Sequence, residues 1–94
     1  MNSNQLDDEI RKWALAESQN IVNKMLDGVK QKTPVKTGFA RDSWVIANQI
    51  SQLGDVGVIN NDAPYIGWLE FGTDRMYPRY MVRDTILELQ REYP

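Results

Sequence analysis

The chain of 94 residues contains no cysteine and no histidine. Without cysteine it forms no disulfide and no thiolate metal site, and without histidine it lacks the commonest general base and transition-metal ligand. Its apolar runs are a few residues long, far short of the about 20 residues that a membrane-spanning helix needs. The polar and acidic start over residues 1–9 lacks the basic and apolar segments of a signal peptide. We therefore expect a protein of the cytoplasm, without membrane contact, metal or cofactor.

What remains is a globular composition with nearly balanced charge. Hydrophobic residues make up 41% of the chain, and 11 Lys and Arg stand against 13 Asp and Glu, a formal net charge of −2. This length predicts a single domain over residues 1–94, with a core too small to be very stable alone. The slightly acidic balance argues against a dedicated nucleic-acid-binding protein, whose usual footprint is a strongly basic face.

The first third of the chain predicts one long amphipathic helix. Apolar residues recur at steps of three and four from about residue 4 to residue 32. Pro34 ends the pattern, because the residue before a proline is pushed out of the helical region. Residues 33–38 then predict a loop, and Thr37 can cap a helical turn over residues 39–42.

The middle of the chain predicts a β-hairpin. β-branched and aromatic residues favour a strand over residues 43–52, and a tight turn at residues 53–55 leads to a returning strand over residues 56–60. Gly57 in the returning strand indicates a bulge or a close backbone approach.

Two further helices complete the predicted fold. A capping side chain followed by Pro64 predicts a short helix that runs to Phe71 and stops at Gly72. A last helix is expected over residues 79–92, with one buried apolar stripe made of Val82, Ile86, Leu89 and Tyr93. The predicted fold class is α+β: a long N-terminal helix, a small antiparallel β-sheet built on a hairpin, and a short middle helix and a C-terminal helix packed on one face.

Candidate catalytic groups are few. Asp62, Glu70 and Asp74 are close in sequence, but their spacing fits no metal-binding loop and no oxyanion donor or base accompanies them. Ser43 and the nearby threonines have no histidine to activate them. We expect no catalytic residue, and hence no enzyme.

Basic and aromatic residues alternate near the start of the last helix. Arg75, Arg79 and Arg83 recur every four residues among Tyr77 and Tyr80, an arrangement that can grip single-stranded nucleic acid. The simpler interpretation is a solvated helix start whose tyrosines pack inward. A small nucleic-acid-binding or regulatory module that uses these three arginines stays open as an alternative function.

Charges of one sign occur in blocks. Residues 30–41 contain four bases and no acid, residues 55–74 contain four acids and no base, and residues 75–83 are basic again. The blocks can simply confer solubility, or they can be two faces of a head-to-tail contact that closes a ring of copies. In the second case high salt should weaken the oligomer.

Three aromatic residues lie in the short middle helix. Tyr65, Trp68 and Phe71 fall at steps of three and share one side of it. We predict that Trp68 and Phe71 anchor the core. Tyr65 is the better candidate for an interface residue, because its hydroxyl tolerates a wet rim.

Two stretches together resemble a known protein family. The first is PVKTGFARDS at residues 34–43, and the second is YIGWLEFGT at residues 65–73, followed by MYPRYM at residues 76–81. Their order and spacing are similar to those of small morphogenesis proteins of long-tailed bacteriophages, called minor tail, tail-completion or neck proteins. Ala40 stands where leucine is common in that family, and Ile66 where a small residue is common.

The resemblance implies a non-enzymatic virion protein that joins the head-proximal end of the tail during assembly in the bacterial host cytoplasm. Its partners would be the head-completion proteins, including the connector, and the tail terminator. It would form a homo-oligomeric ring, with DNA only passing through the lumen. The alternative that the isolated chain stays monomeric until a partner templates it is left open.

The two stretches also supply the candidate interface residues. Gly38 and Gly72 would adopt special backbone conformations. Arg41 and Glu70 would form an ion pair that fixes the two loops together, within one subunit or across a subunit boundary. The full set of candidates is Lys36, Thr37, Gly38, Arg41, Tyr65, Glu70, Gly72, Thr73, Arg75, Tyr77 and Arg79.

Overall fold

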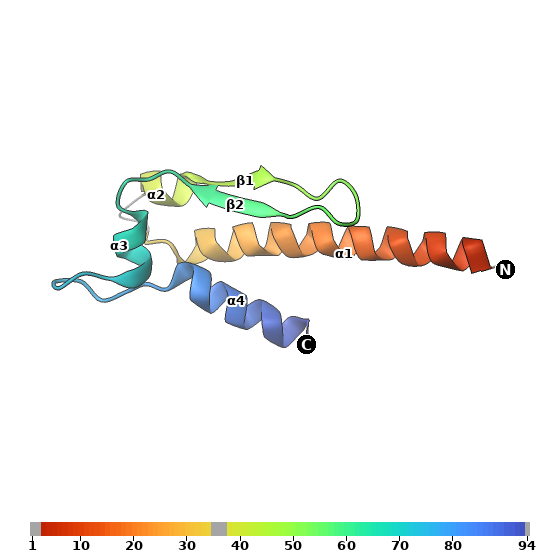
Figure 1. Ribbon diagram of the computed structural model, residues 1–94. Coiled ribbons are helices and arrows are strands. Elements are labelled where there is room, and N and C mark those ends of the chain that lie inside the picture. The colour runs from red at the N-terminus through yellow and green to blue at the C-terminus, as the bar shows by residue number, and fades with distance from the viewer. Residues whose placement is uncertain (1–2, 35–37, 94) are drawn as a thin grey trace.

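A computed structural model describes residues 3–34 and 38–93 of the chain. In order along the sequence it has helices α1 and α2, strands β1 and β2, and helices α3 and α4 (Figure 1). The molecule is elongated, with principal extents of 61 × 24 × 18 Å. The predicted α+β fold, with a long first helix and a small antiparallel sheet, is confirmed.

Helix α1 (Ser3–Lys32) is the longest element and runs along the long axis of the molecule (Figure 1). Its length of 30 residues corresponds to about 45 Å. The C-terminal half packs against the rest of the fold. Residues 7–13 are exposed on every side, because the helix extends past the hairpin and α4 in this region (Figure 1).

Strands β1 (Trp44–Asn48) and β2 (Val58–Asn61) form a two-stranded antiparallel sheet. Trp44 pairs with Asn61, and the register shifts before the pairing ends at Asn48 opposite Val58. The predicted hairpin is therefore confirmed, although both strands are shorter than the β-branched pattern indicates.

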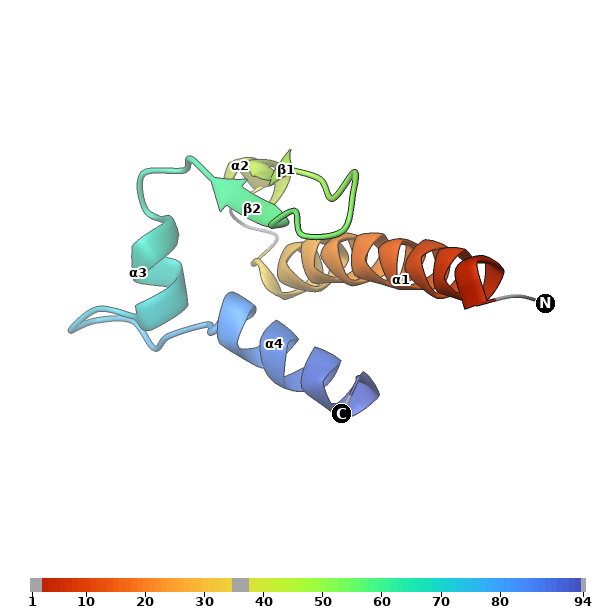
Figure 2. The ribbon, with the colours of Figure 1, turned by 45° about the vertical axis from the view of Figure 1, so that its right-hand side comes forward.

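Helix α1 lies between two layers, with the hairpin on one side and helix α4 (Met81–Glu92) on the other (Figures 1 and 2). Two glycines allow these layers to approach closely. A Cβ on Gly57 would lie 2.5 Å from the Val22 side chain, and a Cβ on Gly28 would lie 2.5 Å from the Thr85 side chain. The close backbone approach predicted at Gly57 is confirmed.

Helices α2 (Gly38–Asp42) and α3 (Ile66–Phe71) are short and flank the sheet at the end opposite the first residues of α1 (Figure 1). Helix α3 begins later than the predicted start near Pro64. The Asn61 side chain accepts a hydrogen bond from the Ala63 N–H at 2.9 Å and so forms a turn at the end of β2. The capping residue inferred from the sequence therefore shapes a turn instead of a helix start.

Helix α4 begins at Met81, two residues after the predicted start. The N–H groups of Arg79 and Tyr80 donate to the carbonyl oxygens of Leu69 at 2.7 Å and Glu70 at 3.2 Å, so they are already bound to α3. Tyr80 has a left-handed backbone with φ +48°, which a helix cannot contain.

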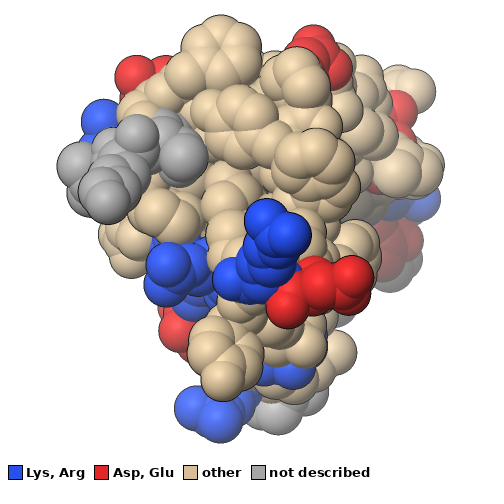
Figure 3. Space-filling model, turned by 90° about the vertical axis from the view of Figure 1, so that its left-hand side faces the viewer, with Lys and Arg blue, Asp and Glu red and all other residues tan. Residues whose placement is uncertain are grey.

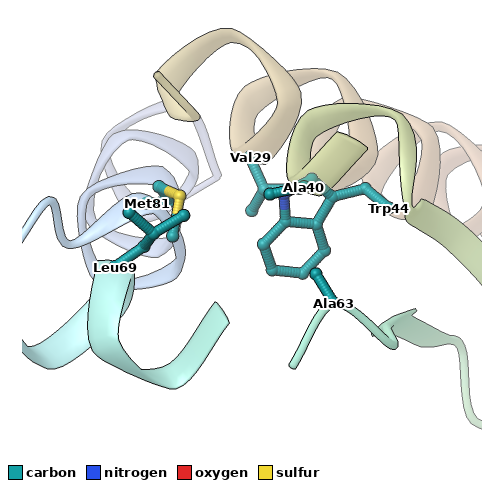
Figure 4. Packing of buried hydrophobic residues seen from close by; sticks show 6 residues of the cluster. All are labelled: Val29, Ala40, Trp44, Ala63, Leu69 and Met81. Carbon is teal, nitrogen blue, oxygen red and sulfur yellow. The ribbon is translucent and has the colours of Figure 1, made fainter. Parts of the chain in front are cut away.

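The hydrophobic core lies where the elements converge near the C-terminal end of α1 (Figure 4). The Trp44 indole lies beside Ala40 and Ala63, and its N–H donates to the Thr33 hydroxyl at 2.8 Å. That hydroxyl in turn donates to the Val29 carbonyl oxygen at 2.7 Å. The buried cluster consists of Val29, Ala40, Trp44, Ala63, Leu69 and Met81.

The buried face of α4 differs from the predicted one. Met81 and Thr85 are buried, one helical turn apart, because Thr85 packs against the backbone of α1 at Gly28. The predicted stripe is wrong as a core face, since Ile86 is 42% exposed and its other members are only half-buried.

Candidate assembly interface

The first sequence stretch is described only in part. Lys36 and Thr37 lie outside the described residues, and so does the helix cap predicted at Thr37. Gly38 begins α2 with an ordinary backbone, because the glycines with positive φ among the described residues are Gly54 and Gly72. The special conformation predicted at Gly38 is therefore wrong, and the one at Gly72 is confirmed.

Glu70 caps helix α4 from the inside of the molecule. Its carboxylate is buried, with the residue 8% exposed, and accepts the N–H groups of Val82 at 2.9 Å and Arg83 at 3.2 Å. These groups have no partner within the helix, and the positive end of the helix dipole favours a carboxylate there. The ion pair predicted with Arg41 does not form within the subunit, since the Arg41 side chain contacts Asp42 at 3.4 Å.

Gly72 makes possible the tight turn that follows α3. Its φ is +79°, and a Cβ at this position would lie 2.8 Å from the Met76 carbonyl oxygen and from Pro78. The Thr73 N–H donates to the Met76 carbonyl at 2.9 Å, with a return bond of 3.3 Å. The Thr73 hydroxyl accepts the N–H of Arg75 at 3.2 Å, which places Arg75 in the exposed end of the turn.

The three aromatic residues predicted for the middle helix differ from the prediction, and Tyr65 lies just before α3 instead of within it. Trp68 is 64% exposed and Phe71 is 76% exposed, whereas Tyr65 is half-buried and packs against the core. The six-residue helix buries Leu69 and Glu70 instead. Trp68 and Phe71 share a side, as their spacing predicts, but that side faces outward.

Exposed aromatic and basic side chains are found in α3 and in the segment that follows it, at this end of the molecule. Tyr77 is 91% exposed, and the side chains of Arg75 and Arg79 form no ion pair with any described residue. The end view is dominated by uncharged residues in its upper part, with Lys and Arg side chains grouped below them (Figure 3). We call the surface formed by Trp68, Phe71, Tyr77, Arg75 and Arg79 the tip patch.

Arg83 is not counted in the tip patch, because its side chain has partners within the chain. Its guanidinium lies 3.5 Å from the centre of the Tyr80 ring, and it contacts Asp84 at 3.1 Å. Of the three arginines that recur every four residues, only Arg75 and Arg79 keep side chains without such partners.

The acidic block of the sequence is largely used inside the chain. The Asp55 carboxylate accepts the backbone N–H of Ser51 at 2.9 Å and its hydroxyl at 2.8 Å, and these bonds lower the pKa of Asp55. Asp62 accepts a bond from Asn60 at 2.9 Å, and Glu70 caps α4. Two of the four acids of the block, Asp55 and Glu70, are thus bound within the chain, whereas Asp62 and Asp74 are exposed.

An apolar groove of about 500 Å³ runs between α1, the hairpin and α4. It contains three of the four residues that the sequence predicted as the buried stripe of α4. The groove is lined by Ile21, Val22, Met25, Gly57, Ile59, Ile86, Leu89, Gln90 and Tyr93.

No metal or membrane element is found in the described part of the chain. Within residues 3–34 and 38–93, no group of three or more acidic side chains is placed to hold a metal ion. None of the helices in these ranges combines the length and the apolar character needed to cross a bilayer.

Comparison with known proteins gives one match. The model of the family described as "Bacteriophage HK97-gp10, putative tail-component" matches residues 2–72, which is more than half of the chain and contains α1, the hairpin and α3. No curated protein and no solved structure matches. The first sequence stretch and residues 65–72 of the second lie inside the matched range. The chain thus belongs to the HK97 gp10-like family of bacteriophage tail components, and is a structural protein of the virion.

Proposed function

We propose that this tail component acts at the head–tail junction, in the step that completes the tail before it joins the head. In this proposal the chain is a single domain that binds by protein–protein contacts alone. Its neighbours are the connector or other head-completion proteins on one side and the tail terminator on the other. Copies of the chain form a ring in the neck, and DNA only passes through the lumen.

The tip patch is the observation that supports this proposal. Trp, Tyr and Arg are the residues most often found to dominate the energy of protein–protein contacts. Here Trp68, Phe71 and Tyr77 are largely exposed, and Arg75 and Arg79 have no acidic partner in the described chain. Exposed aromatic residues in such a group indicate a surface that another protein covers.

Electron microscopy of particles made without this gene tests the proposed step. The expected result is filled heads and finished tails that fail to join, because the missing part lies between them. Expression of the wild-type chain from a plasmid should restore joined particles. Normal infectious particles in the absence of the gene would refute the proposal.

A complementation series tests the tip patch. The double substitution Trp68→Ala with Phe71→Ala should fail to restore joining although the chain folds, because both side chains lie outside the core. Leu53→Ala is the matched control, since Leu53 is an exposed apolar residue in the hairpin turn. Equal complementation by both variants would exclude the tip patch as the contact surface.

The nucleic-acid-binding alternative makes a different prediction. If Arg75, Arg79 and Arg83 bind DNA, the purified chain should bind labelled single- or double-stranded DNA tightly at moderate salt, with an affinity that falls steeply as salt rises. Within the chain, Arg83 stacks on the Tyr80 ring and contacts Asp84. Weak, nonspecific DNA binding is the result expected for a protein that only surrounds DNA.

A further inference from the structure

The exposed segment of α1 has an apolar surface of its own. Trp13 is 66% exposed and Ile10 is 53% exposed. At 3.6 residues per turn, these two side chains point roughly 140° around the helix from Val22 and Val29, which face the core. Ile10 lies about five helical turns before Gly28, on the side of α1 that packs against α4, and Trp13 points about 60° further round. The exposed pair therefore continues that side of α1 into the segment that α4 no longer covers.

The charges around this face are acidic. By the same helical geometry, Asp7 and Glu9 lie on either side of the apolar pair, within about 90° of it, and Glu17 follows one turn later in line with it. The basic residues of the segment, Arg11 and Lys12, point to other sides. We call the face formed by Ile10, Trp13, Asp7 and Glu9 the arm face.

The arm face and the tip patch complement each other. Each presents large exposed apolar side chains, the arm with an acidic border and the tip with Arg75 and Arg79. They lie at opposite ends of a molecule 61 Å long, so one copy cannot join its own two surfaces (Figure 1). A contact between them must link different copies head to tail, which is the type of contact that generates rings.

We propose that the arm face of α1 docks on the tip patch of a second copy of this chain. Trp13 and Ile10 then cover Trp68, Phe71 and Tyr77, while Asp7 and Glu9 face Arg75 and Arg79. This contact rests on the proposed ring and deepens it by naming the two surfaces that join neighbouring copies. It also explains why α1 continues beyond the elements against which it packs, since a long amphipathic helix gains most of its stability from packing.

Cross-linking between single-cysteine variants tests the contact directly, because the chain has no cysteine of its own. Asn20→Cys lies beside the arm face, and Asp74→Cys lies in the turn that carries the tip patch. The two purified full-length variants are mixed, and a short thiol-reactive bifunctional reagent is added. The expected product is a heterodimer that forms about tenfold faster than in the control below, which corresponds to about 1.4 kcal/mol of preference.

The control replaces Asn20→Cys by Asp8→Cys, because Asp8 lies on the side of α1 opposite to Ile10 and Trp13. A third pairing, Asn20→Cys with Gln90→Cys, reports on the apolar groove as a rival site for the arm. Cross-linking of Asn20→Cys to Gln90→Cys in preference to Asp74→Cys would overturn the tip patch as the partner. Equal rates for the Asn20→Cys and Asp8→Cys pairs with Asp74→Cys would overturn the contact altogether.

Exchange of the charges distinguishes a specific contact from nonspecific association of the two chains. Asp7→Lys with Glu9→Lys in the arm chain should slow the cross-link about tenfold at low salt, and Arg75→Glu with Arg79→Glu in the tip chain should restore the rate. A restored rate cannot arise from damage to either fold. Failure of the second pair to restore it would refute the proposed charge pairing.

The cross-linking result can be distinguished from the result of the microscopy that tests the proposed function. If particles without the gene fail to join but the cross-link is absent, the junction role stands and the arm-to-tip contact falls. If the cross-link forms but particles join normally without the gene, the copies do associate and the junction role falls.

Discussion

Removal of the Glu70 side chain should destabilise the fold more than removal of any exposed acid. The Glu70 carboxylate is 8% exposed as a residue and accepts two backbone N–H groups, from Val82 and Arg83, at the start of α4. Because it lies in α3, it also ties the two helices together. Glu70→Ala therefore removes a helix cap and a contact between elements in one step.

The magnitude follows from these contacts. Loss of a side-chain cap costs about 1 kcal/mol, and loss of a partly buried charge at a helix N-terminus costs a similar amount. We expect Glu70→Ala to lower the free energy of unfolding by about 2 kcal/mol, out of a total of about 5 kcal/mol for a domain of this size. Glu70→Gln keeps one oxygen acceptor and loses the charge, so about 1 kcal/mol is expected for it.

Urea unfolding followed by circular dichroism measures these differences. With a slope of about 1 kcal/mol per M, Glu70→Ala should move the midpoint down by about 2 M, and Glu70→Gln by about 1 M. Asp74→Ala is the control, because Asp74 is exposed in the next turn and a surface change of this kind stays within about 0.5 kcal/mol. A midpoint for Glu70→Ala equal to that of Asp74→Ala would refute the capping role.

Two further predictions concern the packing of α1 and the hairpin turn. Gly28→Ala should lower the melting temperature although alanine favours helices, because its Cβ would meet the Thr85 methyl group at 2.5 Å. Adding Thr85→Ser removes that methyl group and should restore much of the lost melting temperature. A higher melting temperature for Gly28→Ala alone would contradict this account. The bonds from Ser51 hold the pKa of Asp55 below its ordinary value of 3.8, so their stabilisation is complete above pH 3.8 and is lost as the pH falls through the lower folded value. In an NMR titration the Ser51 amide should keep its hydrogen-bonded shift until the pH is below 3.8, and a midpoint at or above 3.8 would count against the bond.

The elements that the sequence predicted well are those with strong local signals. The periodicity of α1 and the stop at Pro34 locate the first helix to within one residue, and Gly72 marks the end of α3. The end of a short strand or helix depends on non-local bonds instead. The N–H of Tyr80 is bound by the carbonyl of Glu70, ten residues away, and no local pattern in the sequence specifies that bond.

The buried faces were harder to predict than the elements. An apolar stripe on α4 through Ile86 and Leu89 satisfies the helical period, yet the helix buries Met81 and Thr85. The deciding feature is Gly28, which lets α1 approach α4 so closely that only a small side chain fits at the crossing. In the sequence, the glycine inside the long first helix was the signal that another helix packs closely there.

The aromatic residues of α3 were misjudged for a related reason. A small fold has few buried positions, and here Trp44 occupies the centre of the core. Its indole N–H donates to the Thr33 hydroxyl. Little room remains for Trp68 and Phe71. Two large aromatic side chains that a small core cannot hold are themselves a sign of a contact with another protein.

The second stretch that resembles phage morphogenesis proteins contains residues that shape the tip as well as residues of the tip patch. The tip-patch residues that lie within it are Trp68, Phe71, Tyr77 and Arg79. Glu70, Gly72 and Thr73 cap α4 and shape the turn, so their side chains and backbone act within the chain. Their effect is to hold Arg75 and the exposed aromatic residues in fixed positions, and a preorganised patch loses less entropy when it binds. The resemblance therefore identifies the scaffold of the tip, whereas the identity of the partner depends on the exposed residues that this scaffold carries.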